Sequence, residues 1–142
     1  MTHRFVLDTN VLVAGLRSRK GASFALLSRL AEDAGLRPQL SVPLVLEYEA
    51  TLLAHVDELA VNTSDIGELL DFICLTGEHH EIHYLWRPML RDPKDEMVLE
   101  LAVGSGCKKI VTFNSRDFKG AEQFGVTVET PGQFLRRIGA ER

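Results

Sequence analysis

Short apolar runs alternate along this chain with longer stretches in which apolar residues recur at helical spacing. Residues 5–7 (FVL) form a run too brief and too uniformly apolar for a surface element, which predicts a buried strand followed by a helix from about Val11. Further short strands are predicted at 39–42, 79–83, 109–112 and 125–128. Helices are predicted at 22–34, 43–53, 66–75, 93–102 and from 131 onward.

This alternation of short strands and helices indicates an α/β fold. Parallel strands with helical connections require cover on both faces, so we expect a three-layer α/β/α sandwich around a short, mostly parallel, five-stranded sheet. The 142 residues suit a single domain, 1–142. No run approaches the roughly 18 consecutive apolar residues of a membrane span, and the start lacks a signal-peptide pattern. With two distant cysteines, Cys74 and Cys107, which we expect to be reduced, these features predict a cytoplasmic protein.

The charge balance argues against a broadly electrostatic nucleic-acid binder. The formal net charge is −4, so an anionic substrate must be attracted by local basic groups or by a bound cation. One compact basic loop contains Arg17, Arg19 and Lys20. Its simpler interpretation is a solvated surface turn, which we favour. The alternative is a loop beside Asp8 that binds substrate phosphates.

Acidic residues recur just beyond the predicted strands. Asp8 directly follows 5–7, where it can cap the next helix or bind a ligand at the carboxyl edge of the sheet. Asp92 and Asp95 have the same two interpretations, since Asp92 precedes a proline and Asp95 lies in the first helical turn. Glu47 lies in the helix at 43–53, where a solvated glutamate is the simpler interpretation, and Asp117 follows the strand at 109–112.

If the strands are parallel, these acids meet at one edge of the sheet. Asp8, Asp95 and Asp117 would project from that edge, with Glu47 within reach, and such a cluster stays ionised only if a cation binds. An all-oxygen ligand set favours Mg²⁺ or Mn²⁺ over zinc. The chemistry that follows is in-line attack of a metal-activated water on a phosphodiester. Small polar residues that could orient ligands or waters are Thr9, Asn10, Thr112 and Asn114.

A histidine-rich segment offers a second metal hypothesis. His79, His80 and His83 are bunched, with no downstream partner at a zinc-like interval. The alternation of His79, Glu81 and His83 with Ile82 favours a strand instead.

The ordered motifs together resemble those of PIN-domain ribonucleases. They are LDTNVL at 7–12, SVPLVLEY at 41–48, DPKD at 92–95 with LELA at 99–102, and VTFNSRDF at 111–118. VTVETP at 126–131 with Phe134 and Leu135 is similar to the tail of a branch described as toxins of bacterial toxin–antitoxin pairs. The resemblance implies a PIN-like fold and a Mg²⁺- or Mn²⁺-dependent endoribonuclease acting on single-stranded or structured RNA. It also implies a homodimer and an antitoxin partner whose segment blocks the acidic cleft.

The resemblance also implies roles for individual residues. Asp8, Glu47 and Asp95 match the three core acids, and Asp92 matches an additional aspartate of this branch. Many PIN domains have aspartate two residues after the strand-ending threonine, but this chain has Asn114 there and an aspartate at 117. The fourth ligand can therefore be either residue. We expect Asp8, Glu47, Asp95 and Asp117 to be the catalytic and metal-binding set.

Three other functions compete with this one. Aspartate-nucleophile phosphatases need a second Asp two residues after the first, where this chain has Asn10. Response-regulator receivers need paired acids after the first strand and a phospho-acceptor Asp after the third, and neither is present. The closest rival is a PIN scaffold that binds RNA or a protein partner without cutting, and the intact Asp8, Glu47 and Asp95 weigh against it.

Overall fold

The computed structural model describes residues 2–82, 90 and 92–140. These residues form five strands: β1 His3–Leu7, β2 Leu36–Leu40, β3 Glu78–His79, β4 Lys109–Val111 and β5 Thr127–Glu129. They form six helices: α1 Thr9–Arg17, α2 Ala22–Glu32, α3 Val42–Ala54, α4 Thr63–Thr76, α5 Pro93–Gly104 and α6 Pro131–Ala140. Three short 3₁₀ turns are η1 Val56–Glu58, η2 Ser115–Phe118 and η3 Ala121–Phe124.

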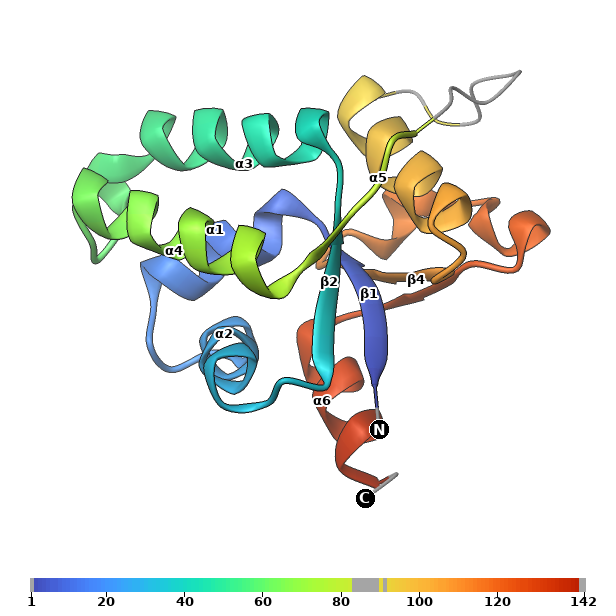
Figure 1. The fold of residues 1–142 in the computed structure, drawn as a ribbon, viewed down its shortest axis with the longest axis horizontal. Coiled ribbons are helices and arrows are strands. Elements are labelled where there is room, and N and C mark those ends of the chain that lie inside the picture. Colours follow the sequence, from blue (N-terminus) through green and yellow to red (C-terminus); the bar gives the residue numbers. More distant parts are fainter. Residues whose placement is uncertain (1, 83–89, 91, 141–142) are drawn as a thin grey trace.

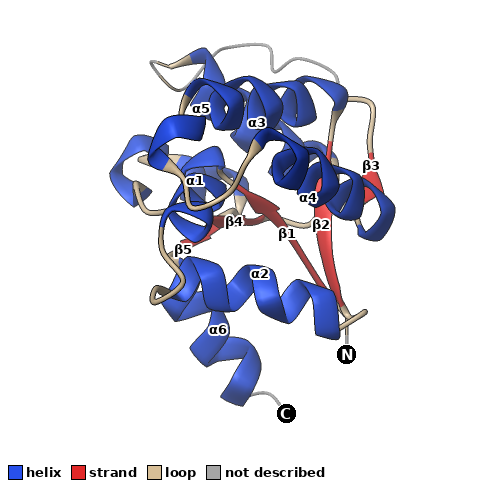
Figure 2. Ribbon diagram, turned by 90° about the vertical axis from the view of Figure 1, so that its left-hand side faces the viewer, coloured by secondary structure: helices blue, strands red, loops and turns tan. Residues whose placement is uncertain are grey.

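All described strand pairs are parallel, in the order β3-β2-β1-β4-β5. The helix α5 packs against β1, β2 and β4 on one side of the sheet, whereas α1, α2 and α4 lie on the other (Figure 1). The predicted α/β/α sandwich with a five-stranded sheet is therefore confirmed. Because β1 is central, the residue that follows it lies in the middle of the carboxyl edge. Figure 2 shows α3 and α5 side by side at that edge.

The core is built around β1, as its apolar run predicts. Phe5, Val6 and Leu7 are fully buried, and the Phe5 ring packs on the Phe134 ring of α6 with centroids 4.7 Å apart. Burying three large side chains on a central strand fixes β1 against both helical layers. This strand is thus a rigid base for whatever follows Leu7.

Local capping explains where the helices begin and end. Asn62 and Asp65 form a reciprocal capping box at the start of α4, within the polar cluster that predicts it. Gly77 ends α4 as predicted, and a Cβ there would lie 2.7 Å from the Pro38 carbonyl oxygen. Glycine is required at this position because the chain turns directly against β2.

Several predicted boundaries are wrong. The second strand, β2, begins three residues before the predicted 39–42 and ends two residues before that range does. It ends early because the Ser41 side chain accepts a hydrogen bond from the Leu44 N–H and starts α3 at Val42. The strand predicted at 79–83 is reduced to the two residues of β3, and its His83 lies outside the described residues. The fifth strand begins at Thr127, since Gly125 ends η3 with a φ of 75°.

Two further expectations concern the thiols and membranes. Cys74 and Cys107 are free thiols, as expected. Within the described residues, each helix is too short or too polar to span a bilayer.

Candidate active site

Asp8 is held at the centre of the carboxyl edge. Its backbone N–H continues the ladder to the Val111 carbonyl at 2.9 Å. Its Oδ1 accepts from the Thr9 N–H at 2.9 Å, so it is the N-cap of α1. Its Oδ2 accepts from the Thr112 hydroxyl at 2.7 Å and the Asn10 amide at 3.2 Å. Asp8 is therefore a helix cap, and its carboxylate is also fixed by groups from two segments.

Asn10 and Thr112 join the start of α1 to the loop after β4. The Asn10 side-chain amide also donates to the Thr112 hydroxyl oxygen at 3.2 Å. The Asn10 Oδ1 accepts from the Phe113 N–H at 3.3 Å. The Asn114 N–H donates to the Thr112 hydroxyl oxygen at 3.0 Å. Of the four small polar residues predicted to orient ligands, Asn10 and Thr112 contact Asp8 through side chains. Thr9 contacts it through its backbone, and Asn114 only through Thr112.

Tyr48 of α3 supports the end of β1, next to Asp8. The sequence did not indicate this role. Its hydroxyl donates to the Leu7 carbonyl at 2.5 Å, and its side chain is fully buried. Burial, with the nearby Asp8 charge, raises the pKa of Tyr48 well above its usual value, so it stays a neutral donor. The hydrogen bond holds α3, and with it Glu47, against the end of β1.

The start of α5 brings Asp92 and Asp95 toward Asp8. Asp92 caps α5 by accepting from the Lys94 N–H at 2.9 Å, as its position before a proline predicts. Burial raises the pKa of Asp95 to about 6, and repulsion from Asp8, Asp92 and Asp117 adds to it. Each of these four aspartates is therefore close enough to influence at least one other.

The Asp8 carboxyl shows the same crowding. Burial raises its pKa, and repulsion from Asp117 and Asp92 adds to the rise. The hydrogen bonds from Thr112 and Thr9 act in the opposite direction because they stabilise the ionised form. Asp117 is exposed on η2, so it reaches this cluster from the loop that follows β4.

Glu47 approaches the cluster from α3. Its Oε1 accepts from the Thr51 hydroxyl at 2.7 Å and lies 3.4 Å from the Lys94 ammonium. Lys94 lies between Asp92 and Asp95 on α5, so this ion pair places Glu47 beside the start of α5. Glu47 is not among the acids that raise the pKa of Asp8 or Asp95. It therefore lies at the margin of the aspartate cluster, with a cation against it.

Across residues 2–82, 90 and 92–140, no three His, Cys, Asp or Glu side chains converge as metal ligands would. The acids do gather, but their bonds to Thr112, Thr51 and Lys94 hold them in separate orientations. The donors are all carboxylate oxygens, which suit Mg²⁺ or Mn²⁺, and a divalent cation would relieve their mutual repulsion. Their chemistry fits such a cation, but the described side chains would have to turn toward one another to bind it.

Comparison with known protein families shows to which family this chain belongs. A family profile described as "PIN domain" matches residues 4–116. The chain belongs to the PIN domain family. The match runs from β1 into η2, so Asp8, Glu47 and Asp95 lie within the matched region of this PIN domain, and Asp117 follows its last residue. Comparisons with curated proteins and with solved structures find no match. Membership assigns the domain a nuclease-type fold.

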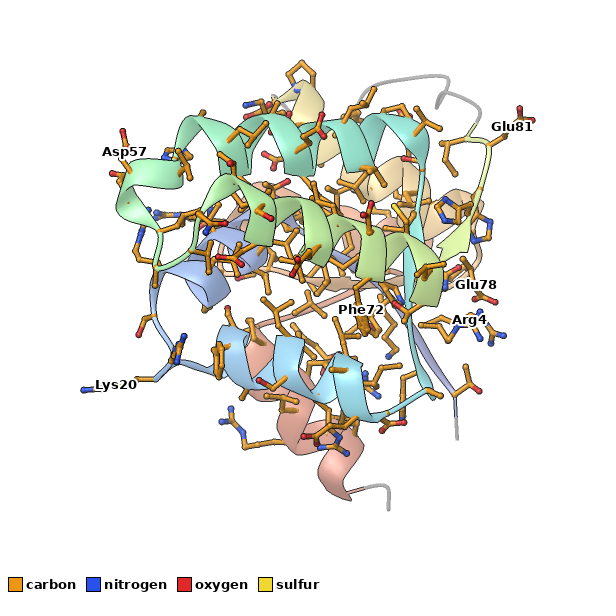
Figure 3. The ribbon with its side chains drawn as sticks, turned by 60° about the vertical axis from the view of Figure 1, so that its left-hand side comes forward. Arg4, Lys20, Asp57, Phe72, Glu78 and Glu81 are labelled. Atoms are coloured by element: carbon orange, nitrogen blue, oxygen red, sulfur yellow. The ribbon has the colours of Figure 1, made fainter. Side chains whose placement is uncertain are left out.

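The basic loop of this PIN domain does not lie beside Asp8, as one interpretation required. Arg17 ends α1, eight residues after Thr9, which at about 1.5 Å per residue is roughly 12 Å from the Asp8 end of the helix. Arg17 instead lies 3.8 Å from Glu58, and Figure 3 shows Lys20 pointing into solvent. With Arg19, these residues form an exposed surface turn. This placement fits the surface-turn interpretation that the sequence favours, and contact of these residues with a substrate stays a prediction.

Two other buried acids of the PIN domain have structural partners. Glu96 accepts from the Leu90 N–H at 2.7 Å, which positions the chain before α5. Glu129, at the end of β5, accepts two hydrogen bonds from Arg137 at 2.9 and 3.0 Å. Neither role could be found from the sequence, because nothing in the local pattern indicates that these side chains are buried.

The described histidines of the predicted metal segment also have structural partners. A ring nitrogen of His80 lies 2.6 Å from Gln39 Oε1, and one of His79 lies 2.9 Å from the Cys74 carbonyl oxygen. Both contacts help to hold β3 at the edge of the sheet, which supports the strand interpretation.

Proposed function

We propose that this PIN domain is a Mg²⁺- or Mn²⁺-dependent endoribonuclease that hydrolyses phosphodiester bonds in RNA. The observation that carries the proposal is the gathering of aspartates from three separate segments at the carboxyl edge. They lie close enough that burial and mutual repulsion raise the pKa of both Asp8 and Asp95. Crowding several carboxylates raises the free energy of the folded protein, and a bound divalent cation reverses that effect.

The proposed ligands are Asp8, Asp95 and Asp117, with Glu47 joining from α3. When bound, the cation would supply an activated water and stabilise charge on the phosphate oxygens. Asp8 is prepared for this role because its three hydrogen bonds occupy three of about four acceptor positions on a carboxylate. One position remains available, and the bonds already fix the direction in which it points. Asn10 and Thr112 then act as positioning residues.

The test is cleavage of a 5′-labelled single-stranded RNA by the purified protein with Mn²⁺, Mg²⁺ or EDTA. We expect cutting with either metal, none with EDTA, and a loss of at least a hundredfold in Asp8→Asn. Asp71→Asn, which removes an exposed carboxylate from α4, is the matched control and should cut normally. Equal cutting by the wild-type protein and Asp8→Asn would identify a contaminant and refute the proposal.

A silent PIN scaffold that binds RNA or a protein is the alternative. It is favoured by the finding that the described acids do not converge as ligands in the metal-free arrangement. Thermal unfolding with Mn²⁺ separates the two. A nuclease centre predicts that millimolar Mn²⁺ raises the melting temperature and that Asp8→Asn abolishes the rise, because only the folded state binds the ion. No rise in either protein would favour the scaffold.

We further propose that the protein acts in the cytoplasm as the toxin of a toxin–antitoxin pair, as a homodimer whose antitoxin covers the acidic edge. The support is the likeness of residues 126–131, with Phe134 and Leu135, to the tail of that branch. Induced expression in a bacterial host should arrest growth, whereas Asp8→Asn should not. Normal growth with the cleaving wild-type protein present would contradict the toxin role and leave the nuclease activity intact.

A further inference from the structure

An aromatic ring stands exposed beside the aspartate cluster. Phe113 directly follows the residue whose hydroxyl bonds Asp8, and it is 46% exposed, whereas Phe5, Phe118 and Phe134 are almost fully buried. Other large exposed apolar side chains in the described chain are aliphatic and lie on α3 and α4: Val42, Leu46, Leu53 and Leu75. Phe113 contributes little to the core, so its place beside the cluster needs another explanation.

The loop that carries Phe113 is held in position by backbone hydrogen bonds. The Phe113 N–H is bound by Asn10 Oδ1 at 3.3 Å, and the next residue is bound to Thr112 at 3.0 Å. The Asp117 N–H closes the turn onto the Asn114 carbonyl at 2.9 Å. A loop already ordered in the free protein loses little entropy when a ligand binds to it.

An unpaired cation lies on the same loop. Arg116 is exposed and forms no ion pair with any residue in 2–82, 90 or 92–140. Its neighbour Asp117 is close enough to raise the pKa of Asp8 and Asp95. A guanidinium within one residue of the cluster can contact a phosphate that lies there.

We propose that Phe113 and Arg116 form a surface that binds one unpaired nucleotide next to the aspartate cluster, with the base stacked on Phe113 and a phosphate held by Arg116. This rests on the proposed nuclease function and assigns two residues beside its aspartate cluster to contact with the RNA. Aromatic stacking combined with a basic group is how proteins bind single strands, and a base inside a duplex has no free face to offer.

A protein partner is a weaker explanation for the exposed ring. The residues that follow it, Asn114, Ser115 and Arg116, are all polar and exposed. Sites for protein partners are larger continuous apolar patches with a polar rim, whereas a single ring among polar groups suits a single base.

Binding is measured in the Asp8→Asn background in EDTA, so that no step depends on cleavage or on a bound metal. The probe is a fluorescein-labelled 12-nucleotide single-stranded RNA, compared with its duplex. We expect tighter binding of the single strand. Phe113→Ala should raise its Kd about tenfold, within the range measured for loss of one base stack. Phe113→Tyr should bind normally, and so should the control Leu75→Ala, which removes an 85% exposed side chain from α4.

Arg116 is tested through the salt dependence of binding. Arg116→Gln should reduce the slope of log K against log salt by about 0.7, the value for one phosphate contact on a single strand. Arg136→Gln, which removes an exposed arginine from α6, is the control and should leave the slope unchanged.

An RNA that lacks one base tests the stacking contact with Phe113 present, so this result does not depend on how well Phe113→Ala folds. With Phe113 present, one abasic position in the RNA should weaken binding about tenfold, and combining it with Phe113→Ala should add no further loss. Equal affinity for duplex and single strand, no RNA binding, or unchanged binding by Phe113→Ala would overturn the proposal. Failure of the nuclease function appears separately, as absence of cleavage by the wild-type protein.

Discussion

Removing the Asp95 charge should change how stability depends on pH. The pKa of this carboxyl rises from its ordinary 3.8 to about 6, first because of burial and then because of repulsion from neighbouring aspartates. Between these two values the folded protein holds a proton that the unfolded chain releases. The free energy of unfolding of the metal-free protein therefore falls as pH rises from about 4 to 7, and Asp95→Asn abolishes this part of the fall.

The size of the effect follows from the pKa shift. A shift of about 2 units corresponds to about 3 kcal/mol at 1.36 kcal/mol per unit. Asp95 is only half-buried, so solvent and salt screen the repulsion and reduce the expected contribution to about 1 kcal/mol. The wild-type protein should thus lose about 1 kcal/mol more than Asp95→Asn between pH 4 and pH 7.

Urea unfolding in EDTA at pH 4, 5, 6 and 7 measures this difference directly. Comparison across pH within each protein removes the constant effect of losing a charge from the first turn of α5. Asp71→Asn should follow the wild-type curve. Parallel curves for wild type and Asp95→Asn would refute the claim that this carboxyl is crowded. Adding Mn²⁺ should reverse the wild-type trend, because the ion binds only ionised carboxylates.

Three further changes test individual contacts. Tyr48→Phe leaves the buried Leu7 carbonyl without its donor and should lower the free energy of unfolding by about 1–2 kcal/mol in urea; an unchanged value would show that the bond contributes nothing. Lys94→Met removes the ammonium that lies 3.4 Å from Glu47 and competes with a cation for this carboxylate. Calorimetry should therefore show Mn²⁺ binding about two- to fivefold tighter. Weaker binding would show instead that Lys94 helps to hold Glu47 in place for the metal. Gly77→Ala places a Cβ 2.7 Å from a carbonyl oxygen of β2 and should lower stability by about 1–3 kcal/mol, and a neutral result would mean that the turn can relax.

The fold was predictable where the local pattern and the tertiary packing agree. The run at 5–7 is buried on the central strand, and the caps at Asn62 and Asp92 begin helices as the sequence indicates. The start of β2 was missed because it includes Pro38, which lacks an N–H and disfavours a central strand. The length of β3 was overestimated because the alternation of polar and apolar residues continues beyond the two residues that pair with β2.

The site was predictable in its position but not in its details. Parallel strands require Asp8 and the acids after later strands to share one edge, and the topology places them there. The role of Tyr48 and the Lys94 contact to Glu47 depend on how α3 and α5 pack together, which no local pattern encodes. The distance between the basic turn and Asp8 could not be predicted, because it is set by the full length of α1.

The most direct test of the central claim is anomalous X-ray scattering from a crystal soaked in Mn²⁺. We expect a peak within ligand distance of the Asp8 and Asp95 carboxylates, with Asp117 or Glu47 turned toward it. The peak should be absent from a crystal of Asp8→Asn treated in the same way. A Mn²⁺ peak elsewhere, or no peak at the Asp8 carboxylate, would contradict the assignment of this edge as a metal-dependent nuclease centre.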